Sequence, residues 1–143
     1  MSLRFAFAVN NNNQFEKKHF GDADKYLIFK QESGKIVFLS EEFNRFKMID
    51  EEVEHGSKQK GNAIIDFLKT KHVNALVAKQ FGKNLKMINK HFIPIIVYTE
   101  QHEEVIQILN HHIHWIADEN NKNTSNYKLF TIRSGVLKSS IKE

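Results

Sequence analysis

Three short apolar segments open the chain before any helical pattern appears, and their order restricts the fold more than any other feature. Leu3–Val9 is apolar almost throughout, and turn-forming residues at 32–35 separate the segments Tyr26–Lys30 and Ile36–Ser40. Apolar runs of this length that are bounded by turn residues are typical of β-strands. The first third of the chain is therefore predicted to be an antiparallel three-stranded meander.

Helical and strand patterns alternate after this meander. An apolar stripe at helical spacing, formed by Ile64, Phe67 and Leu68, predicts a helix that ends near Lys71. Ser57 is a suitable N-cap for that helix. Four further segments are expected to be a strand, a helix, a strand and a helix, over residues 75–78, 83–90, 93–98 and 105–116. This order predicts an α/β fold in which helices cover a mixed sheet.

The length of the chain suits one domain followed by a short tail. It has 143 residues, of which 41% are hydrophobic, so a sizeable core can form. Residues 1–118 are predicted to be the domain, and residues 119–143 a tail in which 127–133 adds an edge strand. The apolar segments are shorter than a membrane span, and the N-terminal MSLRFAFAV lacks the features of a signal peptide. We therefore expect a cytoplasmic protein with no membrane partner.

The chain contains no cysteine, and this restricts its chemistry. Disulfides, thiolate nucleophiles and cysteine-ligated zinc or clusters are excluded. Any metal must be bound by histidine, carboxylate, methionine or backbone oxygen, so the placement of the eight histidines is informative. The formal net charge of +4 makes an anionic partner plausible.

Two histidines lie beside glycines in loops that lead into regular elements. These are His19 in the motif HFG and His55 in the motif HG. Glycine lets the backbone approach a ligand closely, and neutral imidazole is a ligand for metals that include iron. If both loops open at one edge of the sheet, the two imidazoles converge. The alternative is that each histidine only packs within its own turn, which is the more common arrangement for a single histidine.

Several lysines lie in loops or near strand ends that could surround the same mouth. They are expected to form a rim that attracts an anionic ligand: Lys17, Lys18, Lys58, Lys60, Lys79 and Lys83. The helix that begins after Gly82 could add backbone N–H groups. The alternative is a solvated lysine-rich face without a ligand.

A second histidine group, HHIH, lies near the end of the last predicted helix. His111 and His114 are three residues apart and would share a helix face, where they could bind a divalent metal. The alternative, which is favoured, is that these histidines interact with the negative end of the helix dipole.

Several catalytic motifs are absent from the sequence. Gly56 and Gly61 have the outer spacing of a P-loop, but Asn62 and Ala63 replace the lysine and hydroxyl residue that it requires. No GxGxxG motif and no nucleophile elbow occur. The first strand carries no acidic residue, whereas a two-metal nuclease needs acidic ligands. The sequence therefore predicts a protein that is not an enzyme.

Taken in order, these motifs resemble a known family. The order is RFAFAV, HFGDADKYLIF, EHGSKQKGNAIIDFLKTKHVNALVAKQFGKNLKMINKHFIPIIVY and EEVIQIL, over about residues 3–110. It is similar to the dinitrogenase iron-molybdenum cofactor biosynthesis family, which contains nitrogenase accessory and cofactor-carrier proteins. The HFG element is the most specific part of the resemblance.

The resemblance implies a ribonuclease-H-like three-layer α/β/α fold with a five-stranded mixed sheet. It also implies non-catalytic binding of an iron-sulfur or iron-molybdenum cluster, or a precursor of one, with a cluster donor or acceptor protein as the partner. His19 matches the candidate cluster ligand, and His55 matches the assisting loop histidine. The backbone of the site is expected at Gly21, Gly56, Gly82 and Asn84.

Two other functions are consistent with the same sequence. A cofactor-free module could present the basic segment Lys83–Lys90 or the tail strand to a protein partner. Nucleic-acid binding through the basic surface is the weaker alternative, and it predicts an affinity that falls steeply with salt.

Overall fold

The structure is a computed structural model that describes residues 2–48 and 56–139, without the side chains of residues 56–58 and 84. Within these ranges one sheet contains seven strands in the order β3-β2-β1-β4-β5-β6-β7. The strands are β1 Arg4–Val9, β2 Lys25–Glu32, β3 Lys35–Phe43, β4 Ala75–Ala78, β5 Ile93–Val97, β6 Phe130–Arg133 and β7 Val136–Ser139. The helices are α1 Gly56–Thr70, α2 Leu85–Ile88, α3 His102–His111 and α4 Ile113–Asn121, with short 3-10 turns η1 Phe20–Asp22 and η2 Gly82–Asn84.

The predicted α/β class and the N-terminal meander are confirmed. Strands β1, β2 and β3 pair antiparallel, whereas β1, β4, β5 and β6 run parallel to one another. The prediction of five strands is wrong, because residues 130–139 add two more. The tail strand predicted at an edge is also not an edge strand, since β6 pairs with β5 on one side and with β7 on the other.

Three predicted helices differ in detail from the structure. The single helix predicted over residues 105–116 is two helices, which meet at His112 where φ is −114° and ψ is 27°. Ser57 lies inside α1 rather than at its N-cap, because that helix begins at Gly56. The basic helix predicted over residues 83–90 is a 3-10 turn followed by the four-residue α2.

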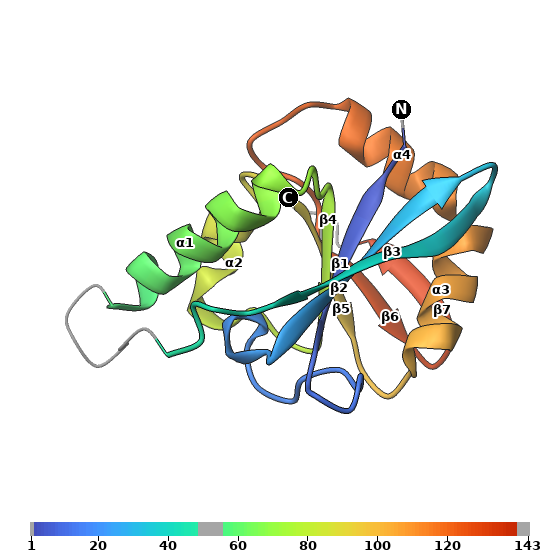
Figure 1. Cartoon of the computed structure of the whole chain (residues 1–143). Coiled ribbons are helices and arrows are strands. Elements are labelled where there is room, and N and C mark those ends of the chain that lie inside the picture. The colour runs from blue at the N-terminus through green and yellow to red at the C-terminus, as the bar shows by residue number, and fades with distance from the viewer. Residues whose placement is uncertain (1, 49–55, 140–143) are drawn as a thin grey trace.

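Two layers of helices enclose the sheet, because the central strands β1 and β4 are apolar on both faces. In β1 the side chains of Phe5 and Phe7 pack towards α3 and α4, whereas Ala6 and Ala8 pack against α1. This alternation follows from the two-residue period of a strand. Figure 1 shows α1 and α2 together on one side of the sheet, and α3 and α4 on the other. No helix within the described ranges is long and apolar enough to cross a membrane.

The parallel strands give the sheet two chemically different edges. The carboxyl ends of β1, β4 and β5 meet at the edge where the loop between β1 and β2 lies, at the bottom of Figure 1. From β4 the chain turns to the α2 face, whereas from β5 it turns to the α3 face. In open α/β sheets, ligands bind in the crevice at such a point, where neighbouring strands send the chain to opposite faces. The carboxyl edge is therefore where a site is expected.

Candidate functional site

The loop that carries His19 is fixed to the carboxyl end of β4. The backbone N–H of Phe20 donates to the carbonyl oxygen of Gln80 over 3.0 Å, and the Gln80 side chain donates to the carbonyl oxygen of Lys17 over 2.8 Å. His19 itself precedes η1, and its carbonyl oxygen accepts the N–H of Asp22 over 2.8 Å. The exposed imidazole of His19 is thus presented from a backbone that is hydrogen-bonded on both sides.

The imidazole of His19 rests directly on Gly82. A Cβ atom at Gly82 would lie 2.8 Å from Cε1 of His19 and 2.9 Å from both ring nitrogens, which is closer than non-bonded atoms approach. Gly82 also has a φ of +62°, a conformation that glycine adopts without the cost other residues incur. The structure therefore brings together two of the predicted site residues, His19 and Gly82.

Buried polar groups hold η1 from below. The side-chain amide of Asn44 donates to the carbonyl oxygens of Gly21 and Ala23, over 3.0 and 2.9 Å. The hydroxyl of Tyr26 donates to the carbonyl oxygen of Phe20 over 2.8 Å. Burial raises the pKa of the Tyr26 phenol far above its ordinary value, and the charge of Asp22 raises it further, so the phenol stays protonated and keeps donating.

Lys60 is a structural residue rather than part of an exposed rim, and the prediction for it is wrong. Its side chain is 3% exposed, and its ammonium group contacts the Asp22 carboxylate over 2.8 Å. A Cβ atom at Gly21 would lie 3.5 Å from Cε of Lys60, so Gly21 allows η1 to pack against α1. The pair of Lys60 and Asp22 ties the His19 loop to α1.

The other predicted site residues divide into exposed ones and undescribed ones. Lys17, Lys18 and Lys83 are exposed, and Gly56 is the first residue of α1. His55 and the side chains of Lys58 and Asn84 lie outside the part of the chain that the structure describes. The convergence of His19 and His55 therefore stays a prediction.

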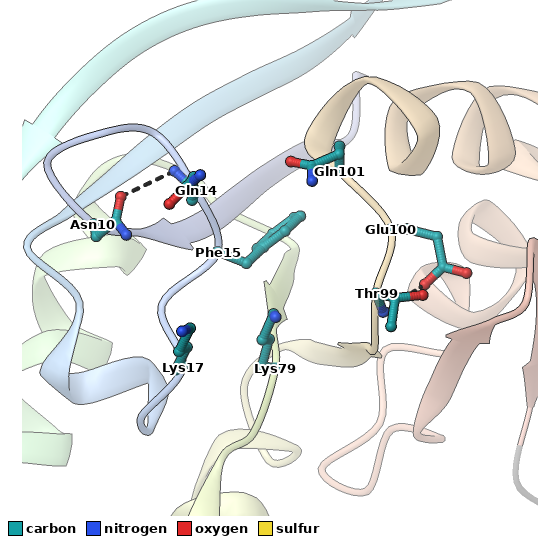
Figure 2. A pocket seen from close by; sticks show the side chains of 8 residues that line it. All are labelled: Asn10, Gln14, Phe15, Lys17, Lys79, Thr99, Glu100 and Gln101. Atoms are coloured by element: carbon teal, nitrogen blue, oxygen red, sulfur yellow. Dashed lines mark hydrogen bonds between the residues drawn. The ribbon is translucent and has the colours of Figure 1, made fainter.

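A crevice of about 240 Å³ opens at the carboxyl edge, between the loop after β1 and the loop after β5. Its lining residues are Asn10, Gln14, Phe15, Lys17, Lys79, Thr99, Glu100 and Gln101. Figure 2 shows the ring of Phe15 between the two loops, with both lysine side chains below it in this view. Apart from the lysines, sequence reasoning missed these residues, although the polar run Thr99–Gln101 follows a strand at the point where a crevice is expected.

The charged residues that line this crevice are two lysines, Lys17 and Lys79, and one carboxylate, Glu100, so their net charge is positive. The Glu100 carboxylate accepts the backbone N–H groups of Thr99 and Gly135, over 3.2 and 2.8 Å. Burial raises the pKa of Glu100, but backbone N–H donors from Gly135, Glu100 itself, Thr99 and Tyr98 outweigh it, so the pKa lies below its ordinary value. The side chains of Lys17 and Lys79 line the crevice and supply two ammonium groups to it.

Glu100→Gln is expected to destabilise the protein by about 1–3 kcal/mol at neutral pH, since a charged acceptor of two N–H groups is lost. The pKa of Glu100 is lowered on folding, so its contribution is present above the unfolded-state pKa and is lost as the pH falls through the folded-state value. Urea unfolding of the wild type and the variant should therefore differ between pH 6 and 8, and the difference should shrink as the pH falls below the ordinary pKa of glutamate, about 4.3. The exposed Glu32→Gln is the control, and a pH-independent difference for Glu100→Gln would contradict this explanation.

The histidines near the end of α3 lie on both sides of a helix break, and metal binding by His111 and His114 stays a prediction. His111 ends α3 and His114 lies in α4, so they do not belong to one continuous helix as predicted. The ring of His112 instead stacks on Trp115, with ring centroids 4.2 Å apart. Among the described residues, no three or more histidine or carboxylate side chains are placed to hold a metal ion.

Comparison with known proteins adds one match. The family described as "Dinitrogenase iron-molybdenum cofactor" matches residues 1–112. The matched range contains the His19 loop, Gly82 and the crevice, and it ends where α3 meets α4. Among curated proteins, none matches this chain.

Proposed function

Because the chain belongs to the dinitrogenase iron-molybdenum cofactor family, we propose that it binds an iron-sulfur or iron-molybdenum cluster, or a precursor of one, beside His19. The observation that carries this proposal is the exposed imidazole that lies on Gly82 at the carboxyl edge. A neutral imidazole nitrogen is a ligand for iron. Because its loop is already hydrogen-bonded, little order has to be gained when iron binds.

The charge around His19 supports an anionic cargo. Lys17, Lys18 and Lys83 are exposed close to His19 in the chain or beside Gly82, and Lys79 lines the adjacent crevice. Ammonium groups at one edge raise the local concentration of an anionic ligand. The cluster is thus attracted by several charges but bonded by few protein atoms.

The small number of candidate metal ligands favours a protein that carries a cluster transiently over one that binds it permanently. His19 is one ligand, and no group of three or more ligating side chains exists within the described residues. A cluster bound here would keep most of its own ligands and would leave readily for an acceptor protein. We propose that this role is non-catalytic, that the protein is cytoplasmic, and that its partner is a cluster donor or acceptor protein. We also propose that the fold is ribonuclease-H-like, which the strand order β3-β2-β1-β4-β5 supports.

His19→Ala is expected to weaken cluster binding about tenfold or more, in the range that loss of a metal-site interaction produces. The apo protein is mixed anaerobically with an iron-sulfur cluster donor, and the visible absorption of the separated protein is followed. Gly82→Ala should weaken binding as well, because its Cβ atom displaces the imidazole. His72→Ala, which removes an exposed histidine in another loop, is the control.

Three results would count against the carrier function. The first is binding that His19→Ala leaves unchanged. The second is binding that His72→Ala reduces equally, which would indicate unspecific metal uptake, and the third is absence of binding in the wild type.

A cofactor-free interaction module is the second candidate, and one observation favours it. Strand β3 lies at an edge of the sheet, and its Phe38 and Phe43 side chains are 57% and 65% exposed. Exposed aromatic residues at a sheet edge are typical of protein interfaces. A partner whose affinity falls in Phe43→Ser but not in His19→Ala would favour this candidate.

A further inference from the structure

A hollow that has no part in the proposed cluster site lies at the amino-terminal ends of the parallel strands, opposite the carboxyl edge. Here the parallel strands begin: Arg4 is the first residue of β1, Asn74 precedes β4, and His91 precedes β5. The hollow measures about 440 Å³ and is lined by Ser2, Arg4, Lys69, His72, Val73, Asn74 and His91. Four of these side chains carry or can carry positive charge, and none is a carboxylate.

Lys69 and His91 contact each other inside this hollow. The ammonium nitrogen of Lys69 lies 3.1 Å from Nδ1 of His91. An ammonium group has only donors, so Nδ1 must accept, and the imidazole is neutral with its proton on Nε2. That proton is then directed away from Lys69 and is available to an acceptor. An imidazole partner, unlike a carboxylate, adds no negative charge that would balance the ammonium group of Lys69.

The charged groups around His91 are two lysines and one aspartate. Burial lowers the pKa of His91, the charges of Lys69 and Lys90 lower it further, and Asp66 opposes them without reversing the direction. Arg4 and His72 also line the hollow. The groups that face His91 are therefore mostly cationic, and an anion in the hollow would relieve their mutual repulsion.

One of these cations, Arg4, has a structural role at the C-terminal end of α1. The guanidinium group of Arg4 donates from Nη1 to the carbonyl oxygen of Lys71 over 3.2 Å, as expected for a cation at a helix C-terminus. That bond uses one of the five N–H donors of the guanidinium. His72 has a φ of +60°, a conformation in which glycine is usual at a helix end, so an imidazole occupies a position that backbone conformation does not favour.

A second hollow continues from the first. It measures about 370 Å³, shares Asn74 and His91 with the first, and is otherwise lined by Asn120, Asn121, Asn123 and Tyr127. Its lining likewise includes no carboxylate. Amide groups can accept or donate to the uncharged part of a ligand whose anionic group lies beside Lys69.

We propose that the hollow formed by Arg4, Lys69, His72 and His91 binds a small phosphate-type dianion. A guanidinium, an ammonium and imidazole N–H groups supply charge-assisted hydrogen bonds, which are the strongest that a tetrahedral oxyanion can form with a protein. The site lies at the edge opposite His19, so it does not depend on the proposed cluster binding.

The test is a titration of the full chain with inorganic phosphate at constant ionic strength, followed by the NMR signals of the histidine rings. The His91 and His72 signals are expected to shift together and to saturate. Lys69→Gln should weaken the apparent affinity about tenfold, the effect of losing one hydrogen bond between charged groups. Lys138→Gln removes the same charge from the exposed strand β7 and should leave the affinity unchanged.

A second titration uses sulfate, because sulfate keeps its charge between pH 5 and 8. A bound dianion raises the pKa of His91, so sulfate should bind more tightly as the pH falls from 8 to 5. Asp66, Lys69, Lys90, Arg4 and His72 are the charged or titratable groups that contribute to this response. In Lys69→Gln the sulfate affinity should be lower throughout this pH range.

A parallel titration with adenosine monophosphate separates the two sources of phosphate. Tighter binding of the nucleotide than of inorganic phosphate assigns the hollow to phosphate esters, and weaker binding assigns it to the free ion. Unsaturable shifts, or equal affinity in Lys69→Gln and the wild type, would overturn the proposal. So would an oligonucleotide that binds through these residues when phosphate does not. His19→Ala should leave phosphate binding unchanged, so this site and the cluster site can fail separately.

Discussion

Removal of residues 119–143 is expected to abolish cooperative folding. These residues supply β6 and β7, and β6 covers the edge of β5. Four of their apolar side chains are buried: Tyr127, Phe130, Ile132 and Leu137. Burial of one such side chain contributes roughly 1.5–3 kcal/mol. The sum, on the order of 6–12 kcal/mol, is comparable with the whole stability of a domain.

Hydrogen bonds outside the strand pairing also connect the same segment to the rest of the chain. The N–H of Tyr127 donates to the carbonyl oxygen of Asn89 over 2.9 Å, and the N–H of Gly135 donates to the Glu100 carboxylate beside the crevice. Truncation would leave these acceptors and the edge of β5 exposed to solvent. An unpaired, apolar strand edge promotes aggregation.

The experiment compares thermal unfolding of residues 1–118 with that of the full chain, by circular dichroism together with size-exclusion chromatography. The expected result is an aggregated or non-cooperatively melting fragment. Ile132→Ala in the full chain should lower stability without preventing folding, because it removes one of the four side chains. A fragment that melts cooperatively near the full-chain temperature would contradict this expectation and support a domain boundary at residue 118.

This expectation differs from what the sequence suggests, and the reason is physical. Strands β6 and β7 have four residues each, FTIR and VLKS, so neither contains an apolar run long enough to predict a buried strand. Their side chains are buried only because β5 already presents an edge for pairing. The family match also ends at residue 112, before these strands begin.

The order of the first eight elements could be predicted, because apolar runs and turn residues record it locally. Strand β4 matches the predicted range 75–78 in full. The break between α3 and α4 could not be predicted, since the apolar stripe continues from Val105 to Ile116 without glycine or proline at the break. His112 marks that break only through its backbone conformation.

The candidate site was predictable where one short motif determines it. The HFG motif predicts a histidine in a loop, and the structure places His19 in a loop with its side chain exposed, whereas its role as a ligand stays a prediction. The burial of Lys60 could not be predicted, because its partner Asp22 is 38 residues away and on a different element. Asn44 was missed for the same reason, although its amide donates to the carbonyl oxygens of Gly21 and Ala23.

Asn44→Leu is expected to destabilise the protein by roughly 2–4 kcal/mol and to loosen the loop that presents His19. Asn44 is 8% exposed, and its amide donates to the carbonyl oxygens of Gly21 and Ala23. Its side-chain oxygen accepts the N–H of Phe46 over 3.1 Å. Leucine has a similar size but forms none of these bonds, so three backbone groups lose their partner in a buried place.

Asn89→Leu is the matched control for this variant. Asn89 is also buried, at 6% exposed, and its amide donates to the side chain of Asn126 and to the carbonyl oxygen of Tyr127. Both variants should lose comparable stability in urea unfolding, since each replaces a buried, hydrogen-bonded asparagine by leucine. Of these two asparagines, Asn44 contacts the turn η1 and Asn89 does not, so Asn44→Leu should affect the position of His19 and Asn89→Leu should not.

Hydrogen exchange at the Asp22 amide separates the two variants, because that amide donates to the carbonyl oxygen of His19 over 2.8 Å. Measured well below the unfolding transition, exchange reports local opening of the turn rather than global unfolding. Exchange at Asp22 should accelerate in Asn44→Leu and stay close to the wild-type rate in Asn89→Leu. Equal rates in both variants would mean that Asn44 contributes only to global stability and not to the position of His19.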